Sequence, residues 1–79
     1  MTEVVLYSRP GCGLCDQARD VLLAERERTP FGFREVDISG DDALELEYGL
    51  RIPVVLVDDV ELFEVRVDAA AFAEALWPS

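Results

Sequence analysis

The sequence contains no lysine and no histidine, and its seven basic residues are all arginines. Against them stand 17 acidic residues, which leave a formal net charge of −10 at pH 7. A surface this acidic repels phosphate groups, so we expect no nucleic-acid partner. Such a surface keeps a small protein soluble, and it also favours basic protein partners.

Long apolar runs are also missing. No stretch approaches the roughly 20 apolar residues that span a bilayer, and the opening Met1-Thr2-Glu3 lacks the basic region of a signal peptide. We therefore expect no membrane association and a cytoplasmic location. The chain has 79 residues, of which 51% are hydrophobic and 30% are charged. This length and composition predict one monomeric domain over residues 1–79 with a single compact core.

Cysteine is scarce, since Cys12 and Cys15 are the only two in the chain. A structural zinc site takes about four sulfur or imidazole ligands, so this pair could hold a metal only in a site shared by two chains. A structural disulfide explains little, because it would close a very short loop. In a reducing compartment, a CxxC pair favours catalysis or metal binding over a structural role.

The two cysteines lie where a predicted strand gives way to a predicted helix. The apolar run 4–7 forms the strand, and the turn-forming segment 8–11 ends it. Backbone N–H groups at the start of a helix stabilise a thiolate, so Cys12 is the candidate nucleophile. Cys15 follows three residues later, within disulfide reach, and is the candidate resolving thiol. The helical spacing is carried by Leu14, Ala18, Val21 and Leu22.

The remaining chain alternates strand-like and helix-like patterns at short intervals. Strands are predicted over residues 31–38, 51–57 and 60–67, with Asp58-Asp59 as a tight turn between the last two. The last two strands should therefore form a hairpin.

Two short helices complete the pattern. The first, capped by Asp41 or Asp42, carries Leu44 and Tyr48 and is expected to end at Gly49 in the left-handed region. The second is capped by Asp68, and Trp77 at its end is expected to cover the edge of the core. Its apolar stripe consists of Ala69, Phe72, Ala73 and Leu76.

This order of elements, with CxxC after the first strand and Ile52-Pro53 at the third, resembles the thioredoxin fold and within it the glutaredoxins. The stretch from Tyr7 to Cys15 resembles the glutaredoxin active-site segment, and Val36-Asp37-Ile38 resembles the end of the second glutaredoxin strand. The resemblance covers nearly the whole chain. It implies an α/β, thioredoxin-like (glutaredoxin-like) βαβαββα fold with a four-stranded mixed sheet flanked by helices.

The resemblance also implies roles for residues outside the CxxC motif. A cis peptide bond before Pro53 would set that residue across the active site from Cys12 and turn the backbone of Ile52 toward an extended substrate chain. Arg9 matches a basic residue that glutaredoxins place beside their nucleophile, where it lowers a thiol pKa and meets a substrate carboxylate. Arg51 is expected to bind anions similarly. As single arginines, both could equally be solvated surface residues.

One residue opposes thiolate formation, and one segment departs from the family. Asp16 stands beside Cys15 and should raise the pKa of the neighbouring thiols through like charge. Glutaredoxins carry two glycines that admit glutathione where this chain reads Leu62-Phe63-Glu64-Val65. Glu64 would repel a glutathione carboxylate if it faces the site. Glutathione is therefore a candidate co-substrate rather than a required one.

The sequence thus predicts a small dithiol thiol–disulfide oxidoreductase with no tightly bound cofactor. Its substrates would be disulfide-containing proteins or glutathione mixed disulfides, attacked by Cys12 and released by Cys15. The alternative is a non-catalytic binding module of the same fold, whose cysteines hold a metal or an iron–sulfur cluster between two chains.

Overall fold

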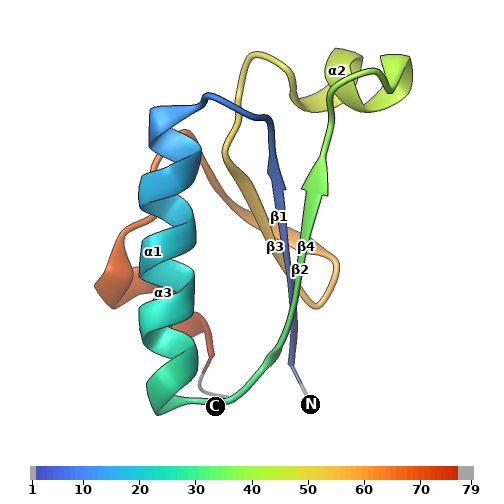
Figure 1. The fold of residues 1–79 in the computed structure, drawn as a ribbon. Coiled ribbons are helices and arrows are strands. Elements are labelled where there is room, and N and C mark those ends of the chain that lie inside the picture. Colours follow the sequence, from blue (N-terminus) through green and yellow to red (C-terminus); the bar gives the residue numbers. More distant parts are fainter. Residues whose placement is uncertain (1, 77–79) are drawn as a thin grey trace.

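The computed structural model describes residues 2–76, which form four strands and three helices (Figure 1). The elements follow one another in the predicted order βαβαββα. In chain order they are β1 (Glu3–Ser8), α1 (Gly13–Arg28), β2 (Gly32–Asp37), α2 (Asp42–Tyr48), β3 (Val54–Val57), β4 (Val60–Glu64) and α3 (Ala69–Ala75).

The strands form one mixed sheet in the order β2-β1-β3-β4. β1 runs parallel to β2 and antiparallel to β3, and β3 pairs antiparallel with β4. α1 and α3 lie on the same side of this sheet, whereas α2 lies beyond one end of it (Figure 1). The predicted fold class is confirmed. None of the helices within residues 2–76 is long and apolar enough to cross a bilayer.

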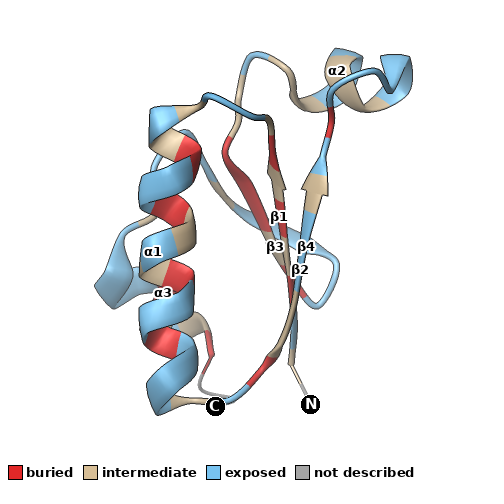
Figure 2. Ribbon diagram, viewed as in Figure 1, coloured by how far each residue is buried: buried red, intermediate tan, exposed pale blue. Residues whose placement is uncertain are grey.

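The core lies between the sheet and the two helices α1 and α3 (Figure 2). In β1, Val4 and Leu6 are fully buried while Val5 and Tyr7 are half-buried, so alternate side chains point into the core. Phe72 of α3 joins the layers, since its ring meets that of Phe31 edge-on with centroids 5.6 Å apart. The core residues are Val4, Leu6, Ala18, Leu22, Phe31, Val55, Val57, Phe72 and Leu76.

The turn between β3 and β4 takes the conformation that its length requires. Asp58 and Asp59 both have positive φ, 49° and 69°, as a two-residue hairpin turn with the right twist demands. The carboxylate of Asp58 also accepts a hydrogen bond of 2.9 Å from the backbone N–H of Glu3. The predicted hairpin is therefore present.

Several details differ from the expectations. β4 ends at Glu64 rather than at residue 67, because Val65 has a φ of 68° and turns the chain out of the strand. Gly49 was expected to be left-handed, but its φ of −52° and ψ of −36° continue the helical conformation. Of the two residues expected to cap α2, Asp41 does so, accepting the N–H of Leu44, which agrees with the expectation. Trp77 lies outside the described residues.

Candidate active site

Cys12 and Cys15 form a disulfide at the start of α1, with their Cα atoms 5.2 Å apart. Their surroundings differ. Cys12 is half-buried at the surface, whereas Cys15 is fully buried on the side of α1 that faces the sheet. A second molecule can therefore reach the sulfur of Cys12 more easily than that of Cys15.

The local sequence explains why α1 begins at this point. The turn after β1 passes through Gly11, whose φ of 78° is tolerated because glycine has no Cβ. Cys12 then has extended backbone angles and serves as the N-cap, with its sulfur accepting the N–H of Cys15 at 3.2 Å. Free N–H groups and the dipole of a 16-residue helix favour negative charge at such a sulfur. The Cys12 position is thus suited to a thiolate.

The loop before β3 lies at the same end of the molecule as the start of α1 (Figure 1). The peptide bond between Ile52 and Pro53 is cis, and Pro53 is buried. The N–H of Val65 donates to the carbonyls of both Arg51 and Pro53, at 3.0 and 2.8 Å. Within residues 2–76, neither the N–H nor the C=O of Ile52 has a backbone partner. The backbone of Ile52 is therefore available to pair with another chain.

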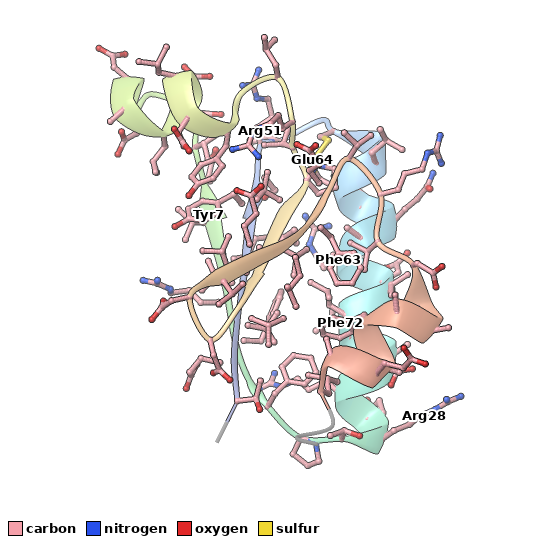
Figure 3. The ribbon with its side chains drawn as sticks, turned by 180° about the vertical axis from the view of Figure 1, so that it is seen from behind. Tyr7, Arg28, Arg51, Phe63, Glu64 and Phe72 are labelled. Carbon is pink, nitrogen blue, oxygen red and sulfur yellow. A yellow bond between two sulfur atoms is a disulfide. The ribbon has the colours of Figure 1, made fainter. Side chains whose placement is uncertain are left out.

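Arg51 is held by carboxylates of its own chain. Its Nη1 lies 2.5 Å from Glu61 and 3.2 Å from Glu64, both on β4 (Figure 3). The hydrogen bonds that Arg51 donates to Glu61 first and Glu64 second raise the pKa of the guanidinium above its usual range. The guanidinium carbon also lies 5.4 Å from the centre of the Tyr48 ring, and Nη2 donates to the Glu47 carbonyl. An anion at Arg51 would have to compete with these partners.

Arg9 is also paired within the chain. Its Nη2 lies 2.9 Å from Glu45 of α2, and both side chains are partly exposed. Its Nε is buried and has no hydrogen-bond partner among the described residues. The two arginines that the sequence singled out for substrate carboxylates therefore both have acidic partners already.

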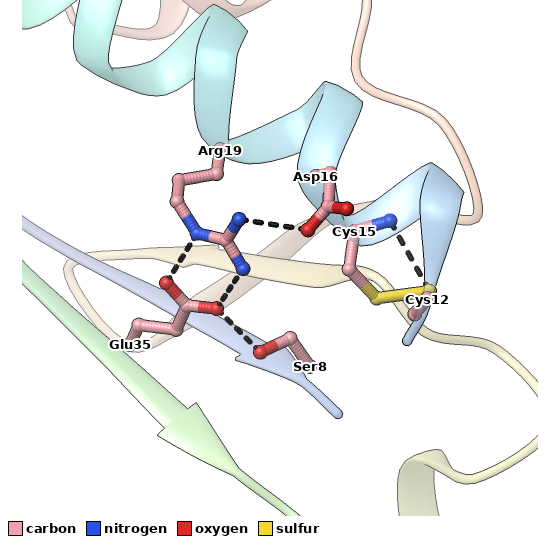
Figure 4. The surroundings of a disulfide bond; sticks show 6 residues. All are labelled: Ser8, Cys12, Cys15, Asp16, Arg19 and Glu35. Carbon is pink, nitrogen blue, oxygen red and sulfur yellow. Dashed lines mark hydrogen bonds and ion pairs between the residues drawn. A yellow bond between two sulfur atoms is a disulfide. The ribbon is translucent and has the colours of Figure 1, made fainter. Parts of the chain in front are cut away.

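The sequence did not predict a polar cluster beside the disulfide (Figure 4). Arg19 on α1 binds Glu35 on β2 through two parallel hydrogen bonds of 2.7 and 2.6 Å, and Ser8 at the end of β1 donates to the same carboxylate at 2.6 Å. Arg19 also binds Asp16 at 2.8 Å. The Asp16 carboxylate, expected to oppose thiolate formation, thus has a cation beside it.

The same cluster lowers the pKa of one of its members, Glu35. The hydrogen bonds donated by Arg19 have the largest effect and lower the pKa of Glu35. Burial raises this pKa, and the hydrogen bond from the Ser8 hydroxyl lowers it again, so the pKa lies below its ordinary value. The only sequence signal was the spacing of Asp16 and Arg19, which predicts a pair within one helix. Nothing local marks Glu35 as their partner, since it lies 16 residues further on in another element.

Within residues 2–76, no three Cys, Asp or Glu side chains gather in a way that could hold a metal ion. The disulfide takes both cysteines, and no free cysteine is left among the described residues.

Solved structures of other proteins share the fold of this chain. A protein from Nitrosomonas europaea matches with a TM-score of 0.83 and 27% identity over 96% of this chain and 92% of its own. A protein from X. campestris is 40% identical, with a TM-score of 0.74, over 92% of this chain and 93% of its own. Chloroplastic thioredoxin z, 15% identical, covers 96% of this chain and 75% of its own with a TM-score of 0.78, which shows a shared thioredoxin-like fold alone.

The family model for the glutaredoxin-like domain (DUF836) matches residues 3–76, which include every strand and helix and both cysteines. The expected resemblance is confirmed, and the cysteine pair in this fold supports a redox role. The chain belongs to the glutaredoxin-like domain family (DUF836).

Proposed function

We propose that the protein is a dithiol thiol–disulfide oxidoreductase. The observation that carries this proposal is the asymmetry of the pair: Cys12 is partly accessible at a helix N-cap, and Cys15 is buried within bonding distance of it. One sulfur can meet a substrate, and the other can reach only the first.

The reaction runs from the reduced pair. The Cys12 thiolate attacks one sulfur of a substrate disulfide, forms a mixed disulfide and expels the other substrate sulfur as a thiolate. Cys15 then attacks the sulfur of Cys12, which releases the second substrate thiolate and forms the Cys12–Cys15 disulfide. Two electrons pass to the substrate. One proton comes from Cys15 and the other from solvent, to which Cys12 released its proton on ionisation, and both end on the two product thiols. A thiol or dithiol reductant must restore the pair for the next turnover.

Protein disulfides are the proposed substrate class. The unpaired backbone groups of Ile52 suit an extended substrate segment that adds beside them, much as a strand adds to a sheet edge. Glutathione mixed disulfides are the second class. Arg9 and Arg51 are engaged by acidic side chains, and Glu64 lies beside Arg51, so carboxylates of glutathione find little free positive charge here.

A trapping experiment tests the mechanism. The reduced Cys15→Ser variant should accumulate a mixed disulfide between Cys12 and a disulfide-bonded protein, because the resolving sulfur is missing. Mass spectrometry under acid quench identifies the adduct. Cys12→Ser should form none and should lose turnover, although it keeps one cysteine. If the Cys15→Ser variant releases protein substrates at the normal rate, the dithiol mechanism is wrong, and a glutathione adduct on Cys12 would then favour monothiol chemistry.

A further inference from the structure

The helix α2 contains no buried residue, although its inner side contacts the rest of the protein. Tyr48 stacks on Tyr7 of β1, with ring centroids 4.3 Å apart, and Glu45 binds Arg9. Leu44 is half-buried. These contacts fix α2 beyond the end of the sheet, at the end of the molecule where α1 begins (Figure 1).

Two leucines, one on α2 and one two residues beyond its end, are almost fully exposed to solvent. Leu46 is 90% exposed and Leu50 is 101% exposed, compared with 40% for Leu23 on α1. Because Gly49 keeps helical backbone angles, the two leucines, four residues apart, share one face. A single exposed leucine needs no explanation, but a pair of almost fully exposed leucines at the same end of the molecule as the disulfide marks a candidate contact surface.

Acidic residues precede and follow Leu46 along the helix. Asp41 caps α2 and Asp42 is its first residue, and Glu47 is 66% exposed with only a long contact of 3.6 Å to Arg51. A second copy of the chain would bring another net charge of −10 to the contact, so self-association through this face is opposed by repulsion. A basic partner would be attracted instead.

We propose that Leu46 and Leu50, with the acidic residues around them, form a docking surface for a basic protein segment that brings its disulfide to Cys12. This inference rests on the proposed function and narrows its substrate class to basic proteins with apolar side chains near the disulfide. The leucines supply apolar contact, and the carboxylates select the charge of the partner.

Docking and chemistry can be measured separately. The docking probe is a fluorescent synthetic peptide with lysines and two leucines, in which serines replace the disulfide cysteines, and its sister carries glutamates instead of lysines. Binding to the oxidised protein is followed by anisotropy. The chemical probes are the disulfide form of the lysine peptide and 2-hydroxyethyl disulfide, which is too small to dock. Both oxidise the pre-reduced protein. The fraction of the protein that carries the Cys12–Cys15 disulfide is measured over time after alkylation of the free thiols.

The protein should bind the lysine peptide at least about tenfold more tightly than the glutamate peptide, and Leu46→Gln/Leu50→Gln should weaken that binding by about tenfold. The double variant should slow the lysine-peptide reaction similarly and react with 2-hydroxyethyl disulfide as the unchanged protein does. Since both leucines are exposed, their replacement removes no packing from the fold. The matched control, Leu23→Gln, alters another exposed leucine. It should change neither the affinity for the lysine peptide nor the rate of the lysine-peptide reaction.

The outcomes separate the two proposals. Equal binding of the two peptides, or unchanged binding by the double variant, overturns the docking surface while normal oxidation upholds the proposed function. Binding as expected without oxidation by either disulfide overturns the proposed function and upholds the surface. A concentration-dependent dimer in sedimentation that Leu46→Gln/Leu50→Gln abolishes would assign the surface to a second copy and overturn the basic partner.

Discussion

Val65 adopts a backbone conformation that β-branched residues rarely take. Its φ of 68° lies in the left-handed region, where the Cβ crowds the backbone. The same residue donates its N–H to the carbonyls of Arg51 and Pro53. The conformation therefore fixes the loop beside the disulfide, and strain at such a position is typical of a functional site.

Replacing Val65 with glycine should relieve that strain. The gain of about 1–2 kcal/mol from relieved strain is offset by the entropic cost of glycine and by packing lost from a residue that is only 40% exposed. We therefore expect Val65→Gly to leave the free energy of unfolding within about 0.5 kcal/mol of its original value. Urea denaturation measures the change. Val60→Gly is the matched control, because Val60 is an exposed valine of β4 outside the left-handed region, and it should lose stability by about 0.5–1 kcal/mol. Equal losses in both variants would contradict the strain at Val65.

The sequence predicted the partners of some side chains and missed the partners of others. The spacing of Cys12 and Cys15 predicts their approach, because helical geometry alone brings residues three apart together. Arg9 and Arg51 were harder to interpret, since their carboxylates lie 36 and 10–13 residues away in other elements. The spacing within one element is local information, whereas these pairs depend on how the elements pack.

At the scale of elements, the pair Arg19–Glu35 joins α1 to β2, and Ser8 adds β1 to the same cluster. The cluster lies beside the disulfide (Figure 4), so it ties the redox helix to the sheet. The arrangement is bidentate and only partly exposed, with 32% and 27% of the two side chains accessible. Such geometry makes an ion pair more stabilising than an ordinary surface pair.

The cluster should make stability depend on pH. Because the folded protein holds the pKa of Glu35 below its ordinary value, mainly through Arg19, ionised Glu35 stabilises the fold above the unfolded pKa of about 4.3. That contribution is lost as the pH falls from there through the lower folded pKa. Denaturation along a pH series should therefore show a smaller loss of stability in acid for Glu35→Gln than for the unchanged protein.

The matched control is Glu74→Gln, which neutralises an exposed carboxylate on α3 outside the cluster. It should follow the acid profile of the unchanged protein. If Glu35→Gln and Glu74→Gln flatten the profile equally, the effect comes from net charge and the link between α1 and β2 does not contribute.

The order of elements was predictable because each carries its own signal of periodicity, capping or turn chemistry. Asp68 accepts the N–H groups of Ala70 and Ala71 as an N-cap should. The errors occurred where tertiary contacts override local preference. Gly49 remains helical next to Arg9, and β4 stops at Val65, whose N–H bonds to a distant loop.

At the scale of the whole molecule, the acidic residues far outnumber the arginines that can pair with them. All the ion pairs among the described residues use an arginine, and Arg51 alone contacts Glu47, Glu61 and Glu64. With 17 acidic residues against seven basic ones, many carboxylates remain without a cation. Their mutual repulsion acts against the compact state.

Added salt should therefore stabilise this protein near neutral pH. Raising NaCl from about 20 to about 200 mM shortens the screening length from roughly 20 to 7 Å, which weakens repulsion between distant carboxylates more than the short contacts of Arg19 and Arg51. We expect the midpoint of thermal unfolding to rise by about 6 °C, equivalent to about 1 kcal/mol in a domain of this size. Near pH 4, where many carboxylates are protonated, the same titration should have a much smaller effect. A fall of the midpoint with salt at neutral pH would instead show that the arginine pairs outweigh the repulsion of the unpaired acids.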